Sequence, residues 1–179
     1  LYIRQWTMDS TILKPFLQLC DELSAPAFVY TKQGEAGLKV YYSHESPAME
    51  TFRTKREGIY RKPFERTKYL EALTDQAIVY VNLMASPEQL QPLLHLAQAL
   101  PLNVSFYRDV YWPDTWLLEI HHEEASKGTA LAYLKQTQRF DEVYAFGDNL
   151  NDLSLFAEAE VRIAVANAAT ELKTRADTI

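Results

Sequence analysis

The chain has 179 residues, of which 47% are hydrophobic, and a formal net charge of −6; this length suffices for one good core or for two small lobes. The acidic balance, with no run of Lys or Arg longer than two, argues against a nucleic-acid surface, because phosphate-backbone binding needs a clustered basic face. A single cysteine, Cys20, excludes an internal disulfide, and no secretory or membrane-spanning apolar stretch occurs. We therefore expect a globular, cytoplasmic protein that binds neither nucleic acid nor a membrane.

Residues 9–121 alternate between helical and strand patterns, in the order helix, two strands, helix, strand, helix, two strands. Apolar residues repeat at helical spacing after Asp9, and Ser46 and Ser86, each followed by proline, are typical helix starts. The basic and aromatic stretch 58–75 predicts a loop with a short helix. We expect helices at 9–23, 46–57 and 86–100, and strands at 27–31, 38–43, 77–84, 103–107 and 115–121. This order is typical of an α+β layer with mostly antiparallel strands.

Beyond residue 124 the pattern changes to a strict alternation of helices and strands. We expect helices at 126–138, 151–158 and 167–176, the last capped by Asn167, and strands at 142–146 and 161–165. Alternation of this kind predicts parallel strands joined by right-handed crossovers. We place a domain boundary near residues 122–125, which separates residues 1–122 from residues 123–179.

The sequence GDNLND, residues 147–152, follows directly after the strand expected at 142–146 and precedes a helix. Open α/β sheets place their ligand chemistry at this kind of junction. Asp148 is the candidate Mg²⁺ ligand, because Mg²⁺ usually takes one or two protein carboxylates and keeps several waters. Asn151 and Asp152 can cap backbone amides, and the Asn151 amide can also donate to an oxyanion. The alternative is a plain turn in which these side chains serve only as caps.

Lys127 lies in the first turn of the helix expected at 126–138, where the helix dipole disfavours a cation by about 0.3–1 kcal/mol. An anion bound at this helix start would be favoured by the dipole and by Lys127 together. The alternative is a solvated surface lysine. The position of Lys127, one helix and one strand before GDNLND, favours the anion site.

Three segments carry a family resemblance: LEIHHEEASKGTALAYL, YAFGDNLNDLSLF and VRIAVANAATELKTRAD, at 118–134, 144–156 and 161–177. They resemble the C-terminal half of the Cof-type haloacid dehalogenase-like hydrolases, which are phosphatases with a large α+β cap inserted into a Rossmann-like core. The resemblance implies an α/β fold, with the cap at 1–122 and parallel βαβ units of a partial core at 123–179. It implies that Lys127 contacts the transferring phosphoryl group, Asp148 binds Mg²⁺, Asn151 contacts substrate phosphate and Asp152 supports the site through hydrogen bonds.

The family's nucleophile is missing from this sequence. These enzymes attack phosphorus with an aspartate in an N-terminal DxDGT motif, whereas no DxD occurs here and Asp9 has the pattern of a helix cap. We therefore expect a fragment, inactive alone, that lacks the first half of the core and a short C-terminal tail.

The resemblance implies a Mg²⁺-dependent phosphatase that acts on a small phosphorylated metabolite, a sugar phosphate or similar, through an aspartyl-phosphate intermediate on a residue outside this chain. The alternative is a catalytically inactive cap-plus-half-core module that binds a partner, or that self-associates through the exposed edge of the incomplete core.

Residues of the cap supply further hypotheses about the substrate. Aromatic residues surround the turn at 113–114, at Tyr107, Tyr111, Trp112 and Trp116. We expect part of this set to belong to the core and Tyr111 and Trp112 to touch a leaving group. A second substrate charge could meet Arg61, Lys62 and Arg66.

Overall fold

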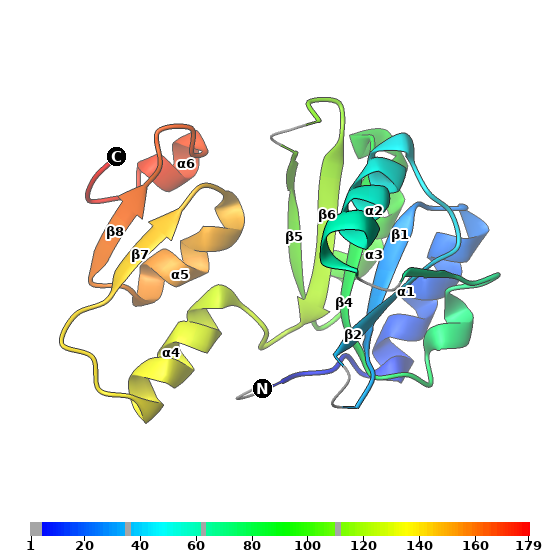
Figure 1. The fold of residues 1–179 in the computed structure, drawn as a ribbon, viewed down its shortest axis with the longest axis horizontal. Coiled ribbons are helices and arrows are strands. Elements are labelled where there is room, and N and C mark those ends of the chain that lie inside the picture. The colour runs from blue at the N-terminus through cyan, green and yellow to red at the C-terminus, as the bar shows by residue number, and fades with distance from the viewer. Residues whose placement is uncertain (1–4, 35–36, 62–63, 110–111) are drawn as a thin grey trace. The chain divides into compact units, whose positions relative to one another are not determined.

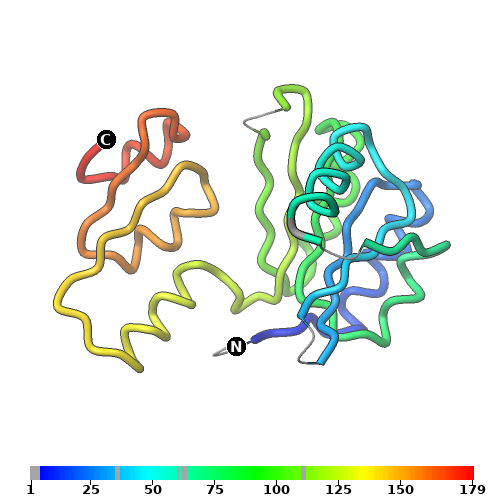
Figure 2. Tube along the Cα trace, in the orientation of Figure 1, coloured from blue at the N-terminus to red at the C-terminus, as the bar shows by residue number. Residues whose placement is uncertain are grey.

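A six-stranded sheet organises the first of the two units into which the chain divides, Leu1–Glu123 and Glu124–Ile179 (Figures 1 and 2). The computed structural model describes residues 5–34, 37–61, 64–109 and 112–179. The strand order is β3-β2-β1-β4-β6-β5, and all neighbours are antiparallel except β2 and β3. The strands are β1 Ala27–Lys32, β2 Leu38–Tyr42, β3 Phe64–Arg66, β4 Ile78–Ala85, β5 Leu102–Arg108 and β6 Trp116–His122.

Helices cover both faces of this sheet, with α1 (Ser10–Glu22) and α3 (Pro87–Gln98) on one face and α2 (Pro47–Tyr60) on the other (Figure 1). The larger core lies beneath α1 and α3, where fully buried Phe16 and Leu93 pack with sheet residues such as Val81. Cys20 is buried in this core, as its place on the apolar stripe of α1 predicts. Met49 of α2 packs in a smaller cluster on the opposite face.

The helix starts of this unit follow the sequence closely. Asp9, Ser46 and Ser86 are the N-caps of α1, α2 and α3, and their side chains accept backbone hydrogen bonds. Ser86 and Gln89 form a capping box. The interpretation of 58–75 as a loop with a short helix is incomplete, because β3 pairs with β2 in addition to the 3-10 helix η1 (Glu71–Leu73). Three residues are too few to display a strand pattern in a sequence.

The second unit contains two parallel strands, β7 (Tyr144–Gly147) and β8 (Val161–Ala164), as the alternation predicts. Its helices are α4 Lys127–Thr137, the 3-10 helix η2 Leu150–Asp152, α5 Leu153–Glu158 and α6 Thr170–Lys173. Buried Ala145, Phe156 and Leu172 form its core. The mixed α/β fold that the sequence predicts is therefore confirmed.

The helix expected at 167–176 is much shorter than predicted, and the prediction that Asn167 caps it is wrong. α6 has four residues and follows Ala169, whose side chain makes no cap. The amides of Ala168 and Ala169 donate instead to the carbonyls of Val165 and Asp148, at 2.9 and 2.8 Å. The second of these bonds holds Ala169 against the end of β7, and α6 begins only after it.

Across the part of the chain that the structure describes, no helix is both long and apolar enough to cross a membrane.

Candidate functional site

The turn that follows β7 is closed by its own side chains. Asn149 is the N-cap of η2 and accepts a hydrogen bond from the amide of Leu150 at 2.8 Å. Asp152 reaches back, and its Oδ2 accepts from the amides of Asp148 and Asn149, at 2.9 and 3.3 Å. The capping role expected for Asp152 is thus confirmed. The same expectation for Asn151 is wrong, because Asn149 caps the turn and Asn151 Oδ1 is buried with no hydrogen-bond partner among the described residues.

Lys127 meets Asp152 although the two residues lie 25 positions apart in the sequence. Lys127 is the first residue of α4, which Ser126 caps, and its Nζ donates to Asp152 Oδ1. The Asp152 side chain is 4% exposed and the Lys127 side chain 50% exposed. This pair therefore joins the start of α4 to the GDNLND turn and leaves part of the lysine open to solvent.

Asp152 is ionised in this environment. Burial raises the pKa of its carboxyl, but the hydrogen bonds from Lys127 and from the amides of Asp148 and Asn149 outweigh burial, and the pKa lies below its ordinary value. A buried carboxylate with three donors is held in one orientation. The charge that Asp152 presents to Lys127 is fixed in position by the turn itself.

Two glycines allow close contacts in this site, one between the end of β7 and Asp152 and one between α4 and α5. A Cβ at Gly147 would lie 2.8 Å from the Asp152 Cβ, and a Cβ at Gly128 would lie 2.4 Å from the backbone oxygen of Ser154 in α5. Any larger residue at Gly147 would push Asp152 away, and any larger residue at Gly128 would separate α4 from α5. The sequence analysis did not identify either glycine, although both stand within the motifs that it singled out.

Asp148 is the remaining carboxylate of the turn. Its side chain is exposed and makes no hydrogen bond or ion pair with any described residue, while its carbonyl accepts from the amide of Ala169 at 2.8 Å. In the ranges 5–34, 37–61, 64–109 and 112–179, no three His, Cys, Asp or Glu side chains gather in a metal-ligand cluster. Mg²⁺ usually binds only one or two protein carboxylates, while water and phosphate supply its other ligands. The single exposed carboxylate of Asp148 is therefore compatible with a Mg²⁺ site.

The aromatic and basic residues singled out in the first unit are dispersed. Trp116 packs on Phe106 with ring centroids 4.7 Å apart and belongs to the core, as expected of part of the set, while Trp112 is 42% exposed. Arg61 follows α2, and Arg66 ends β3. Tyr111 and Lys62 lie outside the described residues.

Comparisons with known proteins were made on the whole chain. The family model described as haloacid dehalogenase-like hydrolase matches residues 2–179. A phosphoglycolate phosphatase of Sulfurisphaera tokodaii is 43% identical over 58 residues, 32% of this chain and 26% of the relative. A Bacillus subtilis protein with a provisional phosphatase name, YxeH, is 32% identical over 112 residues, 62% of this chain and 40% of the relative.

Solved structures share the fold at lower identity. A haloacid dehalogenase-like hydrolase from B. subtilis has a TM-score of 0.75 at 19% identity, over 96% of this chain and 66% of that one. The sugar phosphatase BT4131, of subclass IIB, has a TM-score of 0.70 at 12% identity, over 96% and 61%. This chain therefore spans less than two thirds of these structures and 40% or less of the curated relatives.

Proposed function

This chain belongs to the haloacid dehalogenase-like hydrolases, and from that premise we propose that it forms part of a Mg²⁺-dependent phosphatase acting on a small phosphorylated metabolite, a sugar phosphate or similar. Residues 1–122 would be its cap and residues 123–179 the C-terminal half of its core. The names of the relatives support the reaction class, since phosphatases recur among them. The substrate class rests on the resemblance to sugar phosphatases of the same fold.

One observation carries the proposal: Lys127 is held on Asp152 within the turn that also presents the free carboxylate of Asp148. Half of the Lys127 side chain is exposed, so a phosphoryl oxygen can reach its ammonium group while Asp152 keeps it in place. Asn151 does not cap the turn, which leaves its side-chain amide to contact substrate phosphate. Asp148 would hold Mg²⁺, which when bound offsets negative charge on phosphoryl oxygens.

The nucleophile of this reaction would be an aspartate outside these 179 residues, which becomes phosphorylated and is then hydrolysed. The sequence contains no DxD. The relatives and solved neighbours are longer than the part that this chain matches, which supports a contribution from further sequence.

The experiment replaces Asp148 by Asn in the complete protein and measures turnover of a generic phosphate ester over a Mg²⁺ titration. We expect kcat to fall by about 100-fold or more, the order of loss seen when one group that stabilises transition-state charge is removed. Asp141→Asn, at an exposed carboxylate before β7, is the matched control and should keep the wild-type rate. Wild-type turnover and Mg²⁺ dependence in Asp148→Asn would exclude this assignment.

A second candidate function is a binding module that self-associates. It is favoured by the exposure of Tyr144 and Phe146, at 57% and 64%, on a strand that pairs only with β8 among the described residues. An unpaired strand edge beside exposed apolar side chains is a typical association surface. Sedimentation of this chain distinguishes the candidates, because a phosphatase role requires no self-association.

A further inference from the structure

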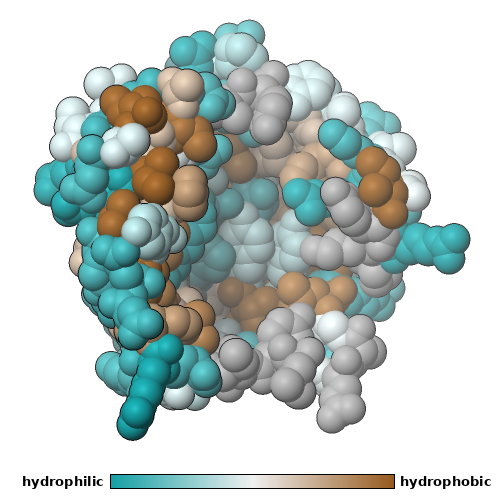
Figure 3. Space-filling model, turned by 60° about the vertical axis from the view of Figure 1, so that its left-hand side comes forward, coloured by the Kyte–Doolittle hydropathy of each residue, from teal (hydrophilic) through white to brown (hydrophobic). Residues whose placement is uncertain are grey.

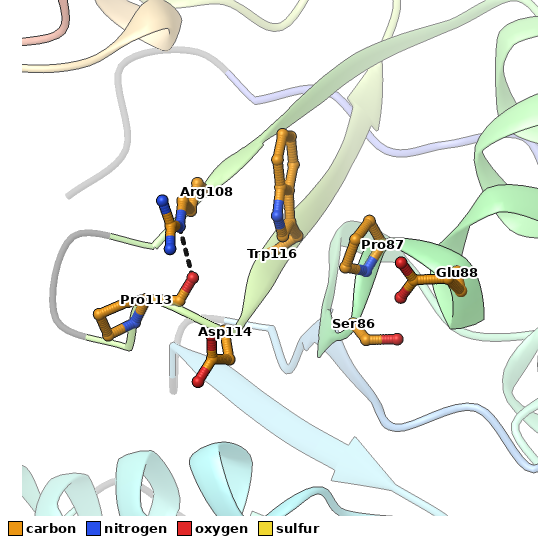
Figure 4. A pocket seen from close by; sticks show the side chains of 7 residues that line it. All are labelled: Ser86, Pro87, Glu88, Arg108, Pro113, Asp114 and Trp116. Carbon is orange, nitrogen blue, oxygen red and sulfur yellow. Dashed lines mark hydrogen bonds between the residues drawn. The ribbon is translucent and has the colours of Figure 1, made fainter.

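A cavity of about 460 Å³ lies at one end of the six-stranded sheet (Figure 4). Its walls come from the turn between β4 and α3 and from the ends of β5 and β6, which meet where Trp116 pairs with both Ala85 and Arg108. The cavity lies entirely within Leu1–Glu123, whereas Lys127, Asp148 and Asp152 belong to the other unit. Its lining residues are therefore different from those of the candidate phosphatase site.

Opposite charges line this cavity without pairing with each other. Arg108 Nε donates to the carbonyl of Pro113, and no ion pair joins Arg108 to Glu88 or Asp114 in the described structure. The backbone amide of Glu88 and the hydroxyl of Ser86 place the pKa of the Glu88 carboxyl below its ordinary value. Neither Arg108 nor Glu88 is neutralised by the other in the described structure, so both can meet a ligand.

A rigid apolar wall separates these charges. The indole of Trp116 stands between Arg108 on one side and Pro87 with Glu88 on the other (Figure 4). Stacking on Phe106, at 4.7 Å between centroids, holds the Trp116 ring from behind. An aliphatic chain can therefore lie on the indole and carry opposite charges at its two ends.

We propose that this cavity binds a small dipolar molecule of the amino-acid type, with its carboxylate on Arg108 and its ammonium group on Glu88 and Asp114. The bond from Nε to Pro113 leaves the two Nη groups of Arg108 to bind a carboxylate. The two carboxylates accept from the three donors of the ammonium group. A ligand with both charges makes an ion pair at each end of the cavity and a ligand with one charge makes only one, so we expect dipolar ligands to bind more tightly.

Tryptophan indole signals test this proposal directly, because the chain has three tryptophans and Trp116→Phe identifies the signal of Trp116. The ¹⁵N-labelled protein is titrated with linear ω-amino acids from β-alanine to 6-aminohexanoate, and with alkylamines and alkylcarboxylates of matched length. We expect at least one ω-amino acid to shift the Trp116 signal with a Kd at least tenfold below those of its matched amine and carboxylate.

Variants assign the two ends of the ligand. Arg108→Gln should raise that Kd at least tenfold, and Asp114→Asn should raise it without disturbing the cap of α3. Arg139→Gln, at an exposed arginine of the other unit that does not line the cavity, should leave it unchanged. The proposal is overturned if no compound shifts Trp116 at up to about 20 mM, if singly charged compounds bind as well as dipolar ones, or if Arg108→Gln binds normally. None of these readouts depends on phosphatase activity.

Discussion

Asp152 organises the candidate site because three donors converge on one buried carboxylate. Its role within the turn could be predicted, since an acidic residue three positions after a cap is a common helix-start pattern. Its pairing with Lys127 was not predicted, because the two residues meet only when α4 and α5 pack together. Local sequence rules do not encode contacts between elements, and for this reason the two enabling glycines also escaped notice.

Replacing Lys127 by Met should destabilise the second unit at pH 7. The substitution keeps the length of the side chain but removes one charged donor from a carboxylate that is 4% exposed. We expect the free energy of unfolding to fall by about 1–2 kcal/mol, less than for a fully buried pair because Lys127 is half exposed. Urea denaturation measures the loss, with Lys55→Met on the exposed face of α2 as the neutral control.

The stability lost in Lys127→Met should become smaller as the pH falls. The folded pKa of Asp152 lies below its ordinary value of 3.8, so the stabilisation is complete above that pH and disappears as the pH falls through the folded pKa. The difference between the wild type and Lys127→Met should therefore shrink below about pH 4. A difference that stays constant from pH 7 to pH 3 would show that the lysine stabilises the unit in another way.

The ends of helices and strands could be predicted where a nearby side chain caps them. They could not be predicted where hydrogen bonds to residues distant in the sequence set them. Ser46 and Ser86 begin their helices in the sequence and in the structure. α6 begins only after Ala169, whose amide bonds to Asp148 near the end of β7, a partner that no window of local sequence contains. β3 exists through pairing with β2 alone.

Two helix glycines should respond to alanine with opposite signs. Alanine in a helix interior is favoured over glycine by about 1 kcal/mol, and Gly58 of α2 has open space around a new Cβ. Gly58→Ala should therefore raise stability by about 0.5–1 kcal/mol. At Gly128 the new Cβ would lie 2.4 Å from the Ser154 backbone oxygen, which a flexible side chain cannot relieve.

Overpacking of this kind costs about 1–3 kcal/mol, so Gly128→Ala should unfold at lower urea than the wild type. The Lys127–Asp152 pair should be weakened with it, since Lys127 is the adjacent residue of α4. A Gly128→Ala protein as stable as the wild type would mean that α4 and α5 do not pack as described.

The pairing order of the larger sheet is a property of the whole first unit. The neighbours β5 and β6 follow from the short connection between them, whereas β1 pairs with β4 across two intervening strands and a helix. Pairing between strands that are distant in the sequence depends on which arrangement buries the helices on both faces of the sheet. The sequence pattern predicted only that the strands are mostly antiparallel. The smaller sheet could be predicted, because two strands joined by a single crossover helix have only one favoured arrangement, in which they are parallel.

That smaller sheet leaves one face of β7 uncovered within its own unit. Tyr144 and Phe146 are exposed, while the alternate residues Ala145 and Gly147 are buried. Hydrophobic atoms, in brown, also reach the surface in several places on the face seen in Figure 3. Exposed rings beside an unpaired strand edge favour association of two copies, which would bury the rings and pair the edges.

The expected outcome is a concentration-dependent increase in sedimentation coefficient over about 1–100 µM for this chain, and a monomer for the double variant Tyr144→Thr, Phe146→Thr. Threonine keeps the preference for a strand while removing the aromatic surface, so a folded monomer is expected rather than an unfolded chain. Tyr69→Thr, which removes an equally exposed ring from the other unit, should associate like the wild type. If the wild-type chain remains monomeric throughout this range, β7 does not act as an association surface.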